Sequence, residues 1–463
     1  MASETEKLFI SESAKRCRDI EKKAILEKNL NHFYKKWENS KSGFSNLAYA
    51  RKKLHYAKFR SIENLEKNLI EFEAKFCSRG GKMFFAAGKD EALKYILDIV
   101  QQSENKKIVK SKSMVCEEIQ LEKFLNLHNI HLLETDLGEF LVQLANESPS
   151  HITAPALHKS KKEIYELLNE KYDQVFDEST PVEAVVQFVR NLLREDFSSA
   201  GIGITGCNFM IADPGVVAIC ENEANAILSA SFPKTHIIVT SIEKIIHSFD
   251  QLELFQTMLS SHATGQNMTV YNHLVFGPAA ASDKNGPEKV YLVVINNNRT
   301  EIMKSVQMRQ AMYCIKCGAC HNFCPVYSQI GGHAYQTVYN GPIGSVISPY
   351  IFGEYEFAYL PFASTLCGKC NTVCPVDMNI TSLLIHKRKH IVDNKYNSSS
   401  ERRLFNKLQR KLLKRKRMDG SVFLKNTVLR TFLKKSWGKE REIPVIAKQS
   451  FCELKKKEKK KKT

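Results

Sequence analysis

The sequence predicts an α/β domain that is preceded by helices and followed by a small helical domain rich in cysteine. Three observations lead to this prediction. Amphipathic stretches rich in Lys and Glu begin the chain, short apolar runs then alternate with charged stretches, and seven of the 13 cysteines fall between Cys314 and Cys374. The 463 residues suffice for two or three domains, and 43% hydrophobic residues exclude a disordered chain or a disulfide-dense miniprotein.

The first segment, residues 1–78, is predicted to be helical. Its apolar residues recur at helical intervals, as in LEKNLNHFYKKWENS and LEKNLIEFEAKFCS. We expect these helices to pack onto the next domain, and Gly80 and Gly81 to separate them from it.

The second segment, residues 79–300, is predicted to be a mixed sheet with helices. Short runs rich in β-branched or aromatic residues predict strands at KMFFAA, KKIVKS, HLLETD and HITAPA. The stretches around them, such as DEALKYILDIVQQ, EEIQLEKFLNL and KEIYELLNEKY, are charged and amphipathic, and this alternation is typical of βαβ units. Further strands are predicted at 203–211, 216–220, 236–240 and 290–296.

Polar residues of this sheet domain leave two interpretations open. They can bind an anionic ligand, or they can form loops whose hydrogen bonds are satisfied internally. The residues are Lys110, Lys112, Lys234, Thr205, Asn208, Asp213 and Glu223. Gly201, Gly203 and Gly206 have the spacing of a nucleotide loop, but no clear strand precedes them, so a turn at a strand edge is the better interpretation.

The third segment, residues 301–395, carries the cysteines. EIMKSVQMRQAMY is predicted to be a helix that leads into the first group, which is C-x2-C-x2-C-x3-C-P and comprises Cys314, Cys317, Cys320 and Cys324. In this iron–sulfur spacing, three thiolates hold three corners of a cubane, and the fourth cysteine binds a different cluster. The second group is Cys367, Cys370 and Cys374. The predicted ligands of one [4Fe-4S] cluster are Cys314, Cys317, Cys320 and Cys374, and those of the other are Cys324, Cys367 and Cys370.

Ser364 stands where a complete second group would have a fourth cysteine. The fourth iron of that cluster is then bound by Ser364, another residue, water or a partner protein, or it is absent, which leaves a [3Fe-4S] centre. Three cysteines can hold a cubane, so an intact [4Fe-4S] cluster is the favoured interpretation. Zinc is the alternative metal, but its tetrahedral sites need four ligands each, and the first group is too crowded for that.

Paired iron–sulfur clusters predict electron relay, because delocalised iron accepts one electron with little geometric change. The substrate chemistry would then take place elsewhere or on a partner. An alternative function is a ligand- or nucleotide-binding module in which the clusters sense redox state or serve as structural elements.

The last segment, residues 396–463, is a basic tail. Residues 381–463 carry 27 Lys and Arg against 7 Asp and Glu, so the net charge of +18 belongs to the end of the chain. A solvated, disordered end is predicted, with peripheral contact to an acidic membrane as the alternative. Nucleic-acid binding is not expected, since few aromatic residues accompany the charge. No apolar run is long enough to span a membrane and no signal peptide begins the chain, so we expect a cytoplasmic protein.

Blocks from about Leu65 to Ile391 resemble the lactate utilization protein B family, the iron–sulfur member of a three-protein bacterial L-lactate oxidation system. The blocks include RGGKMFFA, KIVKSKSMVCEEI, GIGITGCNFMIAD, GGHAYQTVYNGPIGSVISP and STLCGKCNTVCPV. The family also has a serine at the position of Ser364. The chain departs from the family pattern N-E-G-N-G-R, which here is Asn222-Glu223-Ala224-Asn225-Ala226-Ile227 and lacks two glycines and a basic residue.

This resemblance implies a lactate-utilization domain, similar to sugar-isomerase and CoA-transferase folds, followed by an α-helical ferredoxin domain with two [4Fe-4S] clusters. It also implies oxidation of L-lactate to pyruvate, with this chain as a subunit of an L-lactate dehydrogenase complex. The implied partners are a cysteine-rich subunit and a second subunit with a lactate-utilization domain. The family's cluster ligands match the seven cysteines named above.

Overall fold

The structure is a computed structural model that describes residues 3–396, 399–414, 422–433, 442–443 and 445–461. The chain divides into two compact units between residues 396 and 397. The first unit contains the sheets and the cysteine groups, and the second unit is the basic tail. None of the described helices is long and apolar enough to cross a membrane.

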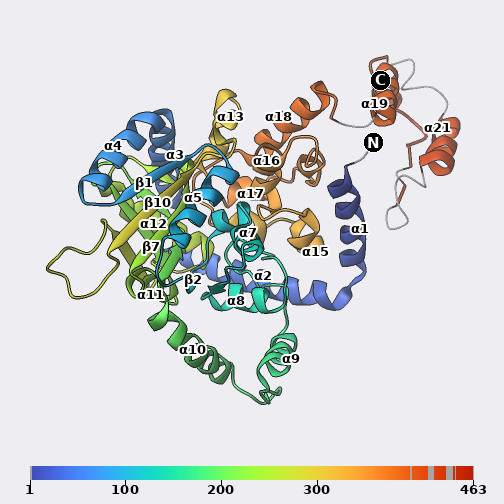
Figure 1. Cartoon of the computed structure of the whole chain (residues 1–463). Helices are drawn as coiled ribbons and strands as arrows, with labels where there is room; N and C mark the ends of the chain where they lie inside the picture. Colours follow the sequence, from blue (N-terminus) through green and yellow to red (C-terminus); the bar gives the residue numbers. More distant parts are fainter. Residues whose placement is uncertain (1–2, 397–398, 415–421, 434–441, 444, 462–463) are drawn as a thin grey trace. The chain divides into compact units, whose positions relative to one another are not determined.

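Four helices begin the first unit: α1 (Glu4–Arg18), α2 (Ile20–Ser40), α3 (Leu47–Glu63) and α4 (Leu65–Ser78). Side-chain oxygens of Ser3, Asp19 and Asn46 cap the first three of them. The buried rings of Phe72 and Phe76 on α4 stack at 5.6 Å within the core that underlies the sheets. In Figure 1, α3 and α4 (blue) lie at the end of the sheet that carries β1.

A six-stranded, wholly parallel sheet forms the centre of the next segment, and it confirms the predicted α/β fold class. Most of its strand residues are buried, as parallel strands between helical layers require. In spatial order the strands are β1 (Lys82–Ala86), β10 (Lys289–Ile295), β7 (Thr235–Ser241), β4 (Ile202–Thr205), β2 (Ile108–Lys110) and β3 (Leu132–Glu134).

A second sheet of four strands packs beside the first and contains antiparallel pairs. Its spatial order is β8 (Ile245–Ile246), β5 (Phe209–Ile211), β6 (Val216–Glu221) and β9 (Tyr271–Val275). The run 203–211, predicted to be one strand, is therefore two strands of different sheets. The chain leaves the first sheet at residues 206–208, where Gly206 allows close approach to Ser113: an added Cβ would lie 2.9 Å from its hydroxyl oxygen.

Helices connect and cover these strands. They are α5 (Lys89–Gln101), α6 (Met114–Glu118), α7 (Leu121–Leu127), α8 (Leu137–Leu144), α9 (Lys161–Tyr172), α10 (Val182–Ser199), α11 (Asn225–Ser231) and α12 (Leu252–Ala263), with 3₁₀ turns η1 (Lys41–Gly43), η2 (Ile242–Lys244) and η3 (Phe249–Gln251). Helices α9 and α10 extend away from the sheet (Figure 1) and share a small apolar cluster with α8.

HITAPA, residues 151–156, is a loop, so the prediction of a strand there is wrong. The Nδ1 atom of His151 accepts the backbone N–H groups of Thr153 and Ala154 at 3.2 and 3.3 Å. These local hydrogen bonds turn the chain, and Pro155 has no N–H group to donate to a sheet.

Short helices follow the sheets: α13 (Arg299–Lys304), α14 (Ala319–Asn322), α15 (Tyr327–Ile330), α16 (Gly341–Phe352), α17 (Lys369–Thr372) and α18 (Ile380–Asp393), with 3₁₀ turns η4 (Arg309–Tyr313), η5 (His333–Tyr335) and η6 (Leu360–Phe362). The predicted continuous helix EIMKSVQMRQAMY is wrong, because the chain bends after Lys304. Ser305 is extended there, and its carbonyl accepts the N–H groups of Met308 and Arg309 at 3.0 and 2.9 Å.

The second unit contains α19 (Ser399–Leu412), α21 (Val422–Val428), a π-helical turn (Leu429–Leu433) and α23 (Phe451–Lys461). The predicted disorder at the end of the chain is wrong for Phe451–Lys461, which form α23. Ser450 and Glu453 form a capping box that starts this helix: each side chain accepts the other's backbone N–H, at 2.9 and 3.4 Å. Residues 462–463 lie outside the described residues.

Candidate metal centres and their surroundings

Four cysteines from two distant parts of the chain line one small cavity. They are Cys314, Cys317, Cys320 and Cys374, and apolar side chains such as Ile152 complete the lining. Lys316 and Gly318 adopt left-handed backbone conformations, with φ of +58° and +76°, which coil the chain tightly between the first three cysteines.

The second set of cysteines, Cys324, Cys367 and Cys370, also lies together. Burial, followed by the charges of Cys324 and Cys367, raises the pKa of the Cys370 thiol to about 11. Ser364 occupies the position that corresponds to Cys314. Its Oγ accepts the backbone N–H of Leu366 at 3.1 Å, just as Cys314 Sγ accepts that of Lys316 at 3.4 Å.

The two sets fit iron–sulfur clusters by the chemistry of their donors. Every cysteine whose side chain the structure describes is free of disulfides. Burial raises the pKa of the thiols of Cys317 and Cys320, and raises that of Cys374 to about 12. Grouped, buried thiols of this kind become thiolates only when a cation compensates their charge, and soft thiolates favour iron–sulfur clusters or zinc.

Helix α3 fixes the turn that carries Cys374. The Arg51 guanidinium donates to the carbonyl oxygens of Asn371, Thr372 and Cys374 at 2.8, 3.0 and 2.7 Å, and pairs with Asp377 at 2.9 Å. The N-terminal helices therefore help to position a cysteine that lies more than 300 residues away in the sequence.

A buried ion network joins the sheet domain to the first cysteine group. Arg299 pairs with Glu118 at 2.7 Å and with Glu243 at 2.6 Å, and Tyr339 donates its hydroxyl to Glu118 at 2.7 Å. Burial opposes ionisation of Glu243, but Arg299 and then Lys316 lower its pKa to about 2. The Lys316 ammonium, between Cys314 and Cys317 in the chain, lies 3.8 Å from Glu243.

A second cavity, of about 250 Å³, lies beside the first. Ile152, Ile315 and Lys316 line both cavities. The polar residues around the second cavity include Ser111, Lys112, Ser113, Asp136, Thr153, Asn208, Glu221, Asn222, Glu223, Lys244, Lys316 and Tyr339.

The structure brings together three of the seven polar residues that the sequence singled out: Lys112, Asn208 and Glu223 line this cavity. Lys110 is fully buried and pairs with Glu134 at 2.6 Å, with Glu117 and Glu139 nearby.

The remaining three predicted residues do not line the cavity. Thr205 hydrogen-bonds to His236 at 2.8 Å, and Asp213 accepts hydrogen bonds from Ser248 and from the backbone of Phe249. The Lys234 side chain is 80% exposed and lies at the amino end of β7, whereas the cavity lies beyond the carboxyl ends of the strands.

Sequence reasoning missed Lys244, Lys316 and Thr153 as cavity residues. The position of Lys316 within the first cysteine group could have indicated that it lies near a functional site. Thr153 lies in HITAPA, and the prediction of a strand there gave no reason to expect Thr153 at a cavity. Lys244 follows β7, and no local motif distinguishes it from a surface lysine.

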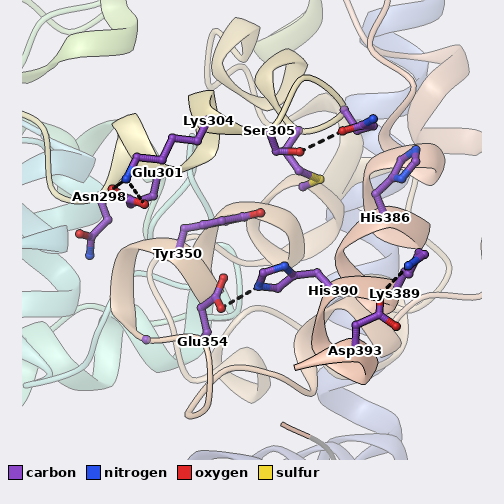
Figure 2. A pocket seen from close by; sticks show the side chains of 13 residues that line it. Asn298, Glu301, Lys304, Ser305, Tyr350, Glu354, His386, Lys389, His390 and Asp393 are labelled. Carbon is purple, nitrogen blue, oxygen red and sulfur yellow. Dashed lines mark hydrogen bonds and ion pairs between the residues drawn. The ribbon is translucent and has the colours of Figure 1, made fainter. Parts of the chain in front are cut away.

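A larger and more open cleft lies between α13, the end of α16 and α18 (Figure 2). Its charged side chains pair with one another: Lys304 with Glu301, Lys389 with Asp393 and His390 with Glu354. None of the residues that line this cleft is a cysteine. The cleft therefore adds no donor to the candidate metal centres.

An α/β domain joined to a helical segment with two ferredoxin-type cysteine groups defines the class of iron–sulfur electron-transfer proteins. Residues 69–295 match the family model of the LUD domain, and residues 310–378 match that of a 4Fe-4S dicluster domain. The dicluster match, together with the grouped cysteines, implies two iron–sulfur clusters.

The chain is 42% identical over 333 residues to lactate utilization protein B of Bacillus subtilis (strain 168), covering 72% of this chain and 69% of that protein. It is also 42% identical to the uncharacterized electron transport protein YkgF of Escherichia coli (strain K12), over 74% of this chain and 71% of that protein. The chain belongs to the lactate utilization protein B family, which confirms the resemblance. A crystal structure of a DUF162 family protein from Deinococcus radiodurans covers 50% of this chain and 98% of its own, with 14% identity and a TM-score of 0.26, too low to bear on the fold.

Proposed function

We propose that this chain is the iron–sulfur electron-transfer subunit of a multi-protein system that oxidises L-lactate to pyruvate. The names of its relatives, lactate utilization protein B and an electron transport protein, support both halves of this proposal. Bound iron–sulfur clusters supply one-electron acceptors, so two neighbouring clusters can together take the two electrons that lactate oxidation releases.

The observation that carries the proposal is the common cavity of Cys314, Cys317, Cys320 and Cys374. We assign these residues to one [4Fe-4S] cluster, and Cys324, Cys367 and Cys370 to the other. Ser364 is our candidate for the fourth ligand of the second cluster, because its Oγ has the same local hydrogen bond as Cys314 Sγ. If the second cluster lacks its fourth iron altogether, it is a [3Fe-4S] centre.

The protein's own groups prepare this arrangement. Arg51 holds the turn at Cys374, and the network of Arg299, Glu118 and Glu243 ties the first cysteine group to the sheet domain through Lys316. In the second group, the residue Cys367 is exposed to solvent. Clusters held by these residues would accept electrons from the side of the sheet domain, beside Cys314, and pass them to a partner beside the exposed Cys367.

The partners that we propose are a cysteine-rich subunit and a second subunit with a lactate-utilization domain, in the cytoplasm. Support comes from the family membership and from the free cysteines, which suit a reducing compartment. The cavity beside the first group, at about 250 Å³, is smaller than the roughly 300–1,000 Å³ of sites for larger ligands, which argues against the alternative of a nucleotide-binding module.

Iron and sulfide analysis of the anaerobically purified protein tests this function. We expect about eight irons per chain in the wild type, and about four when Cys314→Ala is combined with Cys317→Ala, which leaves the first set with only two thiolates. Cys116→Ala is the matched control, since Cys116 is a buried cysteine outside both groups, and it should keep all of the iron. Stoichiometric zinc, or no iron after anaerobic reconstitution, would show that the proposal is wrong.

A further inference from the structure

The cavity of about 250 Å³ lies where parallel α/β sheets commonly bind ligands. Residues directly after β2 and β4 line it, as does Lys244, three residues beyond β7, and these three strands are neighbours in the centre of the sheet. From β2 the chain continues to β3 on one side of the sheet, whereas from β4 the next strand of this sheet is β7, on the other side. Ligands favour the crevice at the carboxyl ends of strands where the order reverses in this way.

The cavity offers a cation that has no partner among the residues that the structure describes. Within residues 3–396, the half-buried Lys112 side chain makes no ion pair within 4 Å and no hydrogen bond. Its charge acts on Glu139 and Glu223 without pairing with either. Lys244 donates to the carbonyl of Cys207, and Lys316 lies 4.4 Å from the centroid of the Tyr339 ring. Lys112 is therefore the cation available to a ligand.

The acidic residues around the cavity are held by backbone N–H groups. Asp136 accepts the N–H of Glu139 at 3.0 Å, and Glu223 accepts that of Leu137 at 3.4 Å. Glu221 accepts two N–H groups at the start of α11, at 2.7 and 2.9 Å, and contacts His273 at 2.7 Å. Because these carboxylates already have donors, they compete little for Lys112.

Size and lining limit the ligand further. A cavity of about 250 Å³ holds a molecule of a few heavy atoms. Hydroxyl and amide groups of Ser111, Ser113 and Asn208 are available beside apolar surface from Ile152 and Ile219. This combination suits a short carboxylate with one further oxygen and a small apolar group.

We propose that this cavity binds a small 2-hydroxy- or 2-oxo-monocarboxylate, with Lys112 as the main contact of its carboxylate. This inference rests on the proposed function and adds a substrate site to this chain. Ile152, Ile315 and Lys316 line both this cavity and the cavity of the four cysteines, so the ligand would lie directly beside the first cluster.

Calorimetric titration of the anaerobic, cluster-loaded full chain with L-lactate and with pyruvate tests the site. Lys112→Gln should weaken binding at least about tenfold, since a hydrogen bond to a charged group is worth roughly 1.5–3 kcal/mol. Lys234→Gln is the matched control, because Lys234 is exposed at the amino end of β7, far from the carboxyl ends that line the cavity. This variant should bind as the wild type does.

A second variant covers the case in which Lys112→Gln fails to fold, which circular dichroism and the visible absorption of the clusters would reveal. Asn208→Asp keeps the oxygen that accepts the N–H of Cys220 at 2.8 Å, but adds a negative charge to the cavity. It should also weaken binding of either carboxylate at least about tenfold.

Three results would overturn the inference: no binding to the wild type, equal binding to Lys112→Gln and Lys234→Gln, or tighter binding of inorganic phosphate than of both carboxylates. Iron and sulfide are measured in the same samples. A loaded protein that binds no carboxylate would refute the site and leave the electron-transfer proposal standing, whereas a protein without iron would refute that proposal itself.

Discussion

The two cysteine groups are versions of one local structure, fifty residues apart. Cys317, Cys320 and Cys324 correspond to Cys367, Cys370 and Cys374, and only Cys314 and Ser364 differ in type. The backbone repeats as well. Lys316 and Leu366 have φ of +58° and +55°, Gly318 and Gly368 have φ of +76° and +81°, and each group continues into a helix of one turn, α14 or α17.

Their surroundings differ. A Cβ atom added to Gly318 would lie 3.3 Å from His151 and 3.4 Å from Thr153, both in the HITAPA loop of the sheet domain. A Cβ atom added to Gly368 would meet no described atom within 4 Å, and neighbouring Cys367 is exposed. The motif thus determines the local geometry, while the rest of the fold determines which group faces the sheet domain and which faces outward.

The crossed assignment of ligands gives the largest predicted effect. Cys314→Ala, Cys317→Ala and Cys374→Ala combined should lose about four of about eight irons, because all three residues serve one cluster. Cys314→Ala, Cys317→Ala and Cys324→Ala combined should lose all of the iron, because each cluster then keeps only two thiolates. Iron and sulfide analysis checks this, and loss of all iron from the first triple variant would contradict the assignment.

The buried ion network of Arg299, Glu118 and Glu243 predicts a large effect on stability. Arg299→Ala leaves Glu118 and Glu243 buried without their partner, so the free energy of unfolding should fall by about 3–5 kcal/mol. Arg309→Ala breaks the partly exposed pair with Glu63 and should cost less than about 1 kcal/mol. Urea denaturation of both variants measures the difference, and equal losses would contradict the network's role.

The pH dependence of stability tests the charges around Lys110. Burial raises the pKa of Glu139 from 4.5 to about 7. A carboxyl whose pKa is raised by folding stabilises the protein below its unfolded pKa, and this contribution is lost as pH rises through the folded pKa. In the wild type, the free energy of unfolding should therefore fall as the pH rises from 4.5 to 7. In Glu139→Gln this fall should be smaller by about 1–2 kcal/mol. Urea denaturation at pH 5 and pH 8 checks this, with Glu63→Gln as a surface control; an unchanged slope would refute the assignment.

Alanine at the two glycines gives the smallest effect and compares the groups directly. Both Gly318→Ala and Gly368→Ala incur the left-handed backbone penalty of about 1–2 kcal/mol. Gly318→Ala should cost about 0.5–1 kcal/mol more, since its new methyl group presses on His151 and Thr153. Denaturation midpoints of the two variants measure this, and equal midpoints would mean that the HITAPA loop does not cover the first group.

Much of the fold could be predicted from periodicity and spacing. The parallel strands KMFFAA and KKIVKS and the helix DEALKYILDIVQQ have strong local patterns. Burial reinforces the pattern in β2 and in α5, whereas β1 is buried only at Ala86. The prediction of a strand at HITAPA is wrong because His151 and Pro155 determine a turn there, and the apolar residues of this segment do not indicate that turn. The helix at the end of the chain begins at a capping box of two residues. In the sequence, the run of lysines favoured a prediction of disorder over this short helix signal.

The candidate sites were predictable to different degrees. The cysteine positions follow from a local motif, so sequence alone yields them. The cavity depends on tertiary structure: Lys110 and Lys112 are two residues apart, yet one is buried among glutamates and the other lines the cavity. Lys244 and Lys316 reach it from distant elements, and no spacing in the sequence brings them together.

Electron paramagnetic resonance of the dithionite-reduced, anaerobically purified protein tests the central claim most directly. Two iron–sulfur clusters close to each other should give two interacting [4Fe-4S] signals in the wild type. Cys314→Ala combined with Cys317→Ala should retain one signal without the interaction. Zinc in place of iron, or a wild-type protein that shows no iron–sulfur signal after anaerobic reconstitution, would contradict the account of this chain as an electron-transfer subunit.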